Sequence, residues 1–312
     1  MRARWRMVAL AGTLPLLATC VTTPRSNSSA DALPPPVAGQ SPIPRPPIVP
    51  EPALTLTLDS TEARQGSLLY GRTNARRLTL NGEEVRVADD GRFIVALDRD
   101  AAASAQLVAE RGQDVQLLTL NVAPGGWRIE NVDAPFRGSA GSDAEFERRR
   151  PAELAQINAA RARTDIVSDG WRQNFIWPAR GRISGLFGSQ RVYRGQPGSY
   201  HSGVDVASGA GSVFVAPADG VVTLAATSPF TLEGNLLIVD HGFGLSSAFL
   251  HAQSLDVRTG ERVTQGQRLG RVGATGRVSG PHLHWAMRWR GARIDPQRLV
   301  GEMSSAAGRQ NR

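Results

Sequence analysis

The chain has 312 residues, of which 41% are hydrophobic and 21% charged, an ordinary composition for a folded protein with room for about two domains. Its formal net charge of +8 comes almost entirely from arginine and favours an anionic partner or surface. The arginines are scattered, without a basic block that contains aromatic residues, so we expect no nucleic-acid partner. A single cysteine, Cys20, excludes an internal disulfide and a metal site built from several thiolates.

Residues 1–20 have the features of an export signal. Three arginines precede an apolar run from Met7 to Ala18, which is too short to span a bilayer because a spanning helix needs about 20 residues. Cys20 follows this run and resembles the lipidated cysteine of a bacterial lipoprotein, although Thr19 stands where a smaller residue is usual. We expect an exported protein of the periplasm or cell envelope. Either Cys20 carries an acyl anchor or the signal is an ordinary cleaved one.

The next two regions differ in composition. Residues 21–52 are rich in proline, serine and alanine and predict an extended, disordered linker. Residues 53–124 contain short alternating segments between turn signals, which predict a small antiparallel β-sandwich. The segments are Leu54–Leu58, Ser67–Tyr70, Arg77–Leu80 and Phe93–Leu97, with turns at Asn81-Gly82 and at Asp89–Gly91.

The second half of the chain divides into a connector, a β-rich region and a tail. Residues 125–174 form the connector, in which Ser142–Thr164 has helical spacing of apolar residues and predicts a helix. Residues 175–300 contain short strands broken by glycines, and residues 301–312 read as a disordered tail. The fold class expected for the whole chain is therefore mainly β.

All five histidines lie in the β-rich region, and they form two suggestive patterns. His201 and Asp205 are four residues apart with Gly203 between them, which favours the start of a strand over a helix. His282 and His284 are two residues apart, so in a strand both imidazoles project from one face. The remaining two are His241 and His251, and His251 taken alone is more typical of a buried structural histidine.

Together these residues predict a catalytic zinc site. Such a site uses three protein ligands and keeps one position open, and His201, Asp205 and one member of the His282/His284 pair would supply the three. Two histidines would remain to handle protons and negative charge. The sequence lacks a His-Glu-x-x-His motif, a Gly-x-Ser-x-Gly elbow and a Walker A loop, which disfavours the corresponding enzyme classes.

Residues 175–299 resemble peptidase family M23, the lysostaphin- and LytM-like zinc endopeptidases. The matching blocks are Trp177–Ile183, His201–Asp205, Ala216–Val222, Asp240–Gly242, Gly266–Gly270, Ser279–His284 and Ile294–Pro296. The resemblance implies an antiparallel β-sheet fold, one Zn²⁺ per chain held by His201, Asp205 and His284, and catalytic roles for His251 and His282. His241 corresponds to a structural histidine. Phe249 and Trp285 depart modestly from the family pattern, which usually has tyrosine and phenylalanine there.

The function implied by this resemblance is hydrolysis of the peptide cross-links of bacterial peptidoglycan by a zinc metalloendopeptidase, as a D,D-endopeptidase. The alternative is a non-enzymatic LytM-like activator of cell-wall amidases. A third alternative is a wall-binding protein in which the β-sandwich does the main work. An uncontrolled wall hydrolase would be lethal to the cell, so residues 125–174, next to the catalytic region, are where we expect a restraint on activity.

Overall fold

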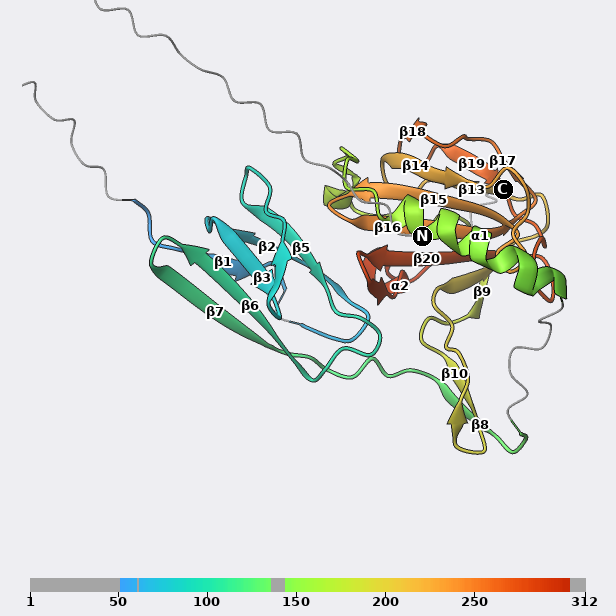
Figure 1. Cartoon of the computed structure of the whole chain (residues 1–312), viewed down its shortest axis with the longest axis horizontal. Helices are drawn as coiled ribbons and strands as arrows, with labels where there is room; N and C mark the ends of the chain where they lie inside the picture. The colour runs from blue at the N-terminus through green and yellow to red at the C-terminus, as the bar shows by residue number, and fades with distance from the viewer. Residues whose placement is uncertain (1–50, 61, 136–143, 304–312) are drawn as a thin grey trace, which may run out of the picture. The chain divides into compact units, whose positions relative to one another are not determined.

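The computed structural model describes residues 51–60, 62–135 and 144–303 (Figure 1). The export signal, Cys20 and all but the end of the linker lie outside the described residues, as does most of the tail, so those expectations remain predictions. The chain from Pro52 onward is one compact unit. Among the described helices, none combines the length and the apolar character needed to cross a membrane.

The N-terminal part of this unit contains two small antiparallel sheets. One has the strand order β1-β2-β5 and the other β4-β3-β6-β7. The strands are β1 (Leu56–Leu58), β2 (Leu68–Thr73), β3 (Arg77–Leu80), β4 (Glu83–Val85), β5 (Arg92–Ala96), β6 (Ser104–Arg111) and β7 (Asp114–Asn121). Leu78 of β3, Phe93 of β5 and Leu107 of β6 are fully buried. The expected mainly β fold is confirmed here, with β6 and β7 as strands that our segment assignment missed.

The predicted hairpin at Asn81-Gly82 is confirmed. Leu80 pairs with Glu83 in the β3–β4 ladder, so the turn contains two residues. Their φ angles are 51° for Asn81 and 86° for Gly82, which is the backbone that a two-residue type I′ turn requires. Asn and Gly adopt positive φ at lower cost than other residues, so the local sequence sets this turn.

The connector contains a strand as well as a helix. Strand β8 (Ile129–Val132) pairs in parallel with β10 (Gln190–Tyr193), which also pairs with β11 (Gln196–Pro197). Helix α1 (Ala144–Arg161) lies within the predicted helical stretch, and the short helix η1 (Gly170–Arg172) follows it. Thus the connector is less purely helical than the sequence indicated.

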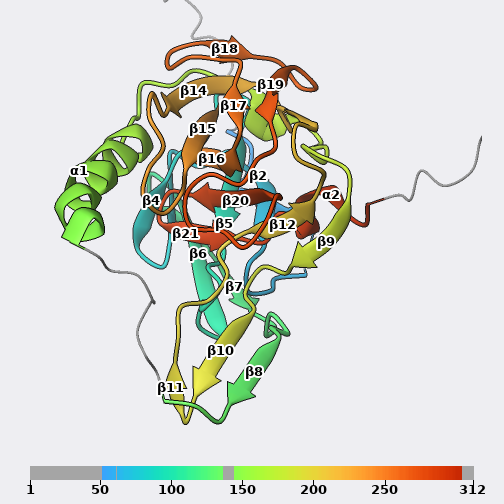
Figure 2. The same ribbon diagram turned by 90° about the vertical axis from the view of Figure 1, so that its right-hand side faces the viewer.

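The C-terminal part is built on one large antiparallel sheet of order β18-β14-β15-β16-β20-β12-β9, with β21 paired to β20 (Figures 1 and 2). Its strands are β9 (Arg182–Gly185), β12 (Val204–Ala207), β14 (Gly220–Ala225), β15 (Asn235–Gly242), β16 (Leu245–Ala252), β18 (Arg262–Val263), β20 (Leu283–Trp289) and β21 (Ala292–Ile294). A smaller sheet contains β13 (Val213–Val215), β19 (Arg268–Arg271) and β17 (Ser254–Leu255), and α2 (Gln297–Val300) ends the ordered chain. The antiparallel sheet expected for this region is confirmed.

The two faces of the large sheet have different roles. On β20, Leu283, Trp285 and Met287 are fully buried in the main core. The opposite face carries a second, smaller apolar cluster, in which Ile157 and Ala160 of α1 contact side chains of β15, β16 and β20. Because side chains alternate along a strand, the same face of β20 also presents His284, Ala286 and Arg288. Helix α1 therefore covers part of the face that bears His284.

Candidate metal centre

Three of the predicted site residues meet where β12 and β20 are paired. His201 lies in the loop just before β12, Asp205 lies within β12, and His284 lies within β20. The antiparallel register places Asp205 directly opposite His284, so two residues far apart in the sequence become neighbours. The strand after Gly203 confirms that this motif begins a strand and not a helix.

The ligand atoms of these three residues form a compact triangle. His201 Nε2 lies 3.0 Å from Asp205 Oδ1 and 3.0 Å from His284 Nδ1, and His284 Nδ1 lies 2.8 Å from Asp205 Oδ1. Among the described residues, this is the one group of three or more potential ligands that clusters closely enough to hold a metal ion. The donor set, two imidazoles and one carboxylate, suits zinc with an open fourth position.

The backbone around the triangle is shaped to leave the ligands room. A Cβ atom added at Gly185 would lie 2.3 Å from Asp205 Oδ2, and one at Gly203 would lie 2.7 Å from His284 Nε2. Glycine at both positions therefore allows the backbone to approach the ligand side chains. His201 Nδ1 donates to the backbone carbonyl of Leu186 at 3.0 Å, which fixes the ring and directs the Nε2 lone pair toward the triangle.

Asp205 is held in its charged form. Burial alone would raise the pKa of this carboxyl, but hydrogen bonds with His201 and His284 outweigh that effect and keep the pKa well below its usual range. A carboxylate that stays ionised at neutral pH is the form that coordinates a cation. The electrostatics of the triangle thus agree with its geometry.

His251 lies at the end of β16, with a positive φ of 63° that is uncommon for a histidine. Its Nδ1 donates to the carbonyl of Thr275 at 2.8 Å, which leaves Nε2 as an unprotonated acceptor in the neutral ring. Burial, followed by the neighbouring His284 and His282, lowers the pKa of His251. This imidazole is therefore neutral near pH 7 and able to accept a proton.

His282 is the second imidazole beside the triangle. Its Nδ1 donates to the carbonyl of Gly280 at 2.9 Å, and its Nε2 lies 3.5 Å from Asp205 Oδ1. The ring centroids of His251 and His282 are 5.1 Å apart. Strand β20 begins one residue later, at Leu283, yet His282 and His284 line the same pocket as the sequence predicted. All five predicted site residues are thus brought together.

His241 lies apart from this group, inside the core. Its Nδ1 donates to the carbonyl of Asp219 at 2.8 Å, and its Nε2 accepts from the hydroxyl of Ser247 at 2.8 Å. The indole N–H of Trp285 donates to the same hydroxyl at 3.1 Å. Burial lowers the pKa of His241 to about 4, so the ring is neutral. These contacts satisfy both ring nitrogens, in agreement with the structural role expected for His241.

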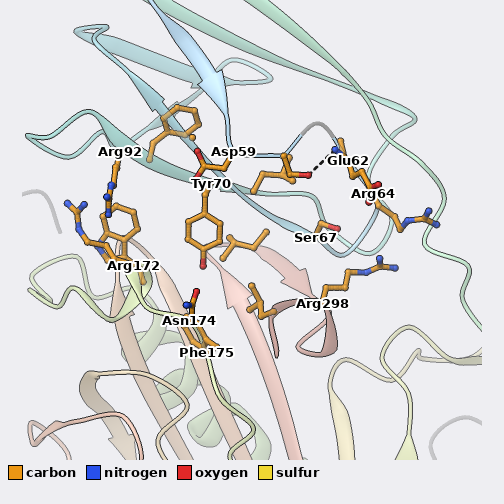
Figure 3. A pocket seen from close by; sticks show the side chains of 18 of the residues that line it. Asp59, Glu62, Arg64, Ser67, Tyr70, Arg92, Arg172, Asn174, Phe175 and Arg298 are labelled. Atoms are coloured by element: carbon orange, nitrogen blue, oxygen red, sulfur yellow. Dashed lines mark hydrogen bonds between the residues drawn. The ribbon is translucent and has the colours of Figure 1, made fainter. Parts of the chain in front are cut away.

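A larger cavity elsewhere lacks the chemistry of this centre. Figure 3 shows it between β2 and the segment that includes Arg172, Asn174 and Phe175, with Tyr70 pointing into it. No histidine is among the residues that line it. The histidine-lined pocket, of about 660 Å³, is therefore the candidate functional site.

Sequence reasoning missed several groups that surround the histidines. The Thr275 and Leu186 carbonyls orient two imidazoles, and five arginines line the pocket. Backbone carbonyls have no sequence signature. The chain has 36 basic residues distributed along its length, so composition could not identify the five arginines that line the pocket.

Comparisons with known proteins agree with this geometry. The model of the family described as "Peptidase family M23" matches residues 199–296. The chain is 35% identical over 136 residues to the cell division protein DipM of Caulobacter vibrioides, a match covering 44% of this chain and 21% of that protein. It is 33% identical over 138 residues to the peptidoglycan DD-endopeptidase ShyA of Vibrio cholerae, a match covering 43% of this chain and 31% of that protein. It is 31% identical over 143 residues to the murein hydrolase activator NlpD of Salmonella dublin, a match covering 46% of this chain and 34% of that protein.

These matches leave most of each relative uncovered, because the chain spans between about a fifth and a third of their lengths. A structure from Pseudomonas aeruginosa ascribed to peptidase M23 matches more broadly. Its TM-score is 0.59 at 26% identity, and the match covers 78% of this chain and 96% of that one. The histidines and aspartate of the pocket all fall within the matched family segment. Residues 199–296 therefore form a domain of peptidase family M23.

Proposed function

We propose that this protein is an exported zinc metalloendopeptidase that hydrolyses the peptide cross-links of bacterial peptidoglycan, as a D,D-endopeptidase. The observation that supports this most is the complete site, in which His201, Asp205 and His284 form a three-ligand triangle with His251 and His282 beside it. Relatives named as peptidoglycan DD-endopeptidases support the choice of substrate. The positive net charge favours approach to an anionic cell wall.

In this proposal His201 Nε2, Asp205 Oδ1 and His284 Nδ1 would hold one zinc ion, which when bound lowers the pKa of water toward 7 and polarises the scissile carbonyl. His251 accepts a proton at Nε2, since its Nδ1 is already committed to Thr275. His282, oriented by Gly280, shares the transfer of that proton from the attacking water to the departing amine. Helix α1 forms one wall of this pocket through Arg150, Leu154 and Ile157.

A non-enzymatic role is the second candidate, because murein hydrolase activators are among the relatives at about the same identity as the endopeptidases. An activator needs neither metal ligands nor proton-transfer groups. The presence of all five site residues in one pocket therefore favours the enzyme over the activator for this chain.

The two candidates differ in an assay on purified sacculi. The zinc-loaded full chain is incubated with sacculi, and released muropeptides are identified by mass spectrometry, with a chelator-treated sample as control. An endopeptidase lowers the amount of cross-linked dimers and raises that of monomers, and the chelator prevents both changes. An unchanged muropeptide pattern together with the absence of bound zinc would reject the enzyme and favour the activator.

A further inference from the structure

The pocket that contains the metal ligands is unusually rich in arginine. Five arginines line it, namely Arg150, Arg161, Arg277, Arg288 and Arg293, against two carboxylates, Asp205 and Glu233. Asp205 belongs to the ligand triangle. The carboxylate of Glu233 accepts hydrogen bonds from Nη1 and Nη2 of Arg150, at 2.6 and 2.8 Å. The pocket therefore presents positive charge beyond what its own carboxylates neutralise.

Arg288 and Arg293 are the clearest part of this surplus. They lie directly opposite each other in the β20–β21 ladder, an arrangement in which like charges destabilise a sheet. Arg288 is half-buried, and its Nε atom is fully buried without a hydrogen-bond partner among the described residues. Leaving such a donor unsatisfied destabilises the folded state. An anion bound between the two arginines would offset the repulsion between their charges.

The neighbours of this pair do not supply that anion. Arg293 donates to the Tyr200 hydroxyl, and Tyr200 directly precedes the ligand His201. The carboxylate of Asp98 accepts a hydrogen bond from the backbone N–H of Arg293 at 2.8 Å. Arg288 Nη2 donates to the carbonyl of Gly291 at 3.4 Å. Over the described ranges, Asp98 forms no ion pair with Arg288 or Arg293, so neither guanidinium group is paired there with a carboxylate.

Arg161 adds a third positive charge from the opposite wall of the pocket. It is the last residue of α1, and its side chain is exposed to solvent. In the described part of the chain, its guanidinium makes neither a hydrogen bond nor an ion pair. Arg161 lines the same pocket as Arg288 and Arg293. A positive charge at a helix C-terminus interacts favourably with the helix dipole, which explains the presence of an arginine at position 161. The helix dipole does not explain the buried, unpaired Nε of Arg288.

We infer that Arg161, Arg288 and Arg293 form a subsite that binds a carboxylate of the substrate peptide. The inference rests on the proposed function, because it specifies an acidic peptide as the substrate that binds in the pocket. Guanidinium groups bind carboxylates through two parallel hydrogen bonds, so they fix the orientation of a peptide as well as its charge.

The position of the subsite sets where that carboxylate lies. Arg288 is four residues beyond His284 on the same face of β20, and a strand rises about 3.3 Å per residue, so the two Cα atoms are about 13 Å apart. An extended peptide advances by a similar length per residue. The recognised carboxylate thus lies within about four residues of the scissile bond, and the subsite determines which stem peptides are cleaved.

The test compares two labelled synthetic cross-linked peptides, one with free carboxylates and one in which every carboxylate is converted to the carboxamide. Binding to the zinc-loaded full chain is measured by fluorescence anisotropy, and cleavage by mass spectrometry. Arg161→Gln removes no side-chain hydrogen bond among the described residues, so the variant should fold. We expect it to bind the carboxylate peptide about tenfold more weakly and the carboxamide peptide with unchanged affinity, the effect of one charge-assisted hydrogen bond. Arg148→Gln, an equal charge change on the same helix outside the pocket, should alter neither.

The outcomes separate this inference from the proposed function. Equal affinity of the wild-type protein for the two peptides, or an equal loss for both in Arg161→Gln, overturns the carboxylate subsite. Selective binding of the carboxylate peptide without any cleavage retains the subsite and rejects the endopeptidase. Cleavage of both peptides at equal rates, with equal affinities, retains the endopeptidase and rejects the subsite. Failure of the wild-type protein to bind either peptide rejects both.

Discussion

His251 is the residue whose replacement tests the proposed chemistry most directly. Its positive φ of 63° makes alanine a poor probe, since alanine resists that backbone, whereas asparagine adopts it readily. His251→Asn therefore removes the imidazole with little backbone strain. The substitution also removes the hydrogen bond to the Thr275 carbonyl, which costs about 1 kcal/mol of stability.

The expected effect on catalysis is much larger than the effect on stability. Loss of one positioned acid–base group lowers the rate by about 10²–10⁴-fold, which corresponds to about 2.7–5.5 kcal/mol in the barrier. Zinc binding should persist at one ion per chain, because His251 is outside the ligand triangle. The assay combines the rate of muropeptide release from sacculi, the zinc content of the purified variant and its thermal melting curve.

A matched substitution at the structural histidine should give the opposite pattern. His241→Gln disturbs the buried contacts to Asp219 and Ser247, so it should lower the melting temperature while folded molecules remain active. The reasoning about His251 is refuted if His251→Asn retains activity within tenfold of wild type with its zinc in place. Loss of zinc from this variant would also contradict the assigned role.

Three further predictions concern the ligands, the core and the sandwich. His201→Ala should lose both zinc binding and cleavage activity, whereas His282→Ala should keep its zinc and lose cleavage activity. Metal analysis and the sacculus assay check both variants. Full activity of His282→Ala would contradict the role assigned to His282. Burial raises the pKa of Asp240 to about 6, so ionisation destabilises the folded state as pH rises above about 4. Relative to wild type, the unfolding free energy of Asp240→Asn should therefore increase between pH 4 and 7, by up to about 3 kcal/mol as measured by urea unfolding. If the difference in unfolding free energy between the variant and wild type stayed constant over this pH range, the titration of Asp240 would be ruled out. Gly82→Ala should lower the unfolding free energy by about 1–2 kcal/mol. The whole effect comes from the positive φ at this position, because the added Cβ would contact nothing. The control is Gly291→Ala, where the added Cβ also contacts nothing but φ is not positive, and it should leave the unfolding free energy unchanged.

The sequence by itself determined the features that depend on neighbouring residues. The Asn81-Gly82 turn follows from the φ preferences of two adjacent residues, and the strand start at Gly203 from a glycine followed by a β-branched residue. The candidate ligands were recognisable because each short motif carries an imidazole or a carboxylate at a spacing that suits a metal site. Strand β7 was missed because Val115 and Leu117 face solvent, so the strand lacks the alternation of a half-buried one.

Only the tertiary structure decided which distant groups meet. The pairing of β12 with β20 sets Asp205 opposite His284, and the Thr275 carbonyl reaches His251 across a loop. The same is true of Arg161 and Arg288, which line one pocket because α1 packs on the sheet through Ile157. Such contacts depend on strand register and on helix docking. These are set by the burial of many side chains at once and leave no local signal in the sequence.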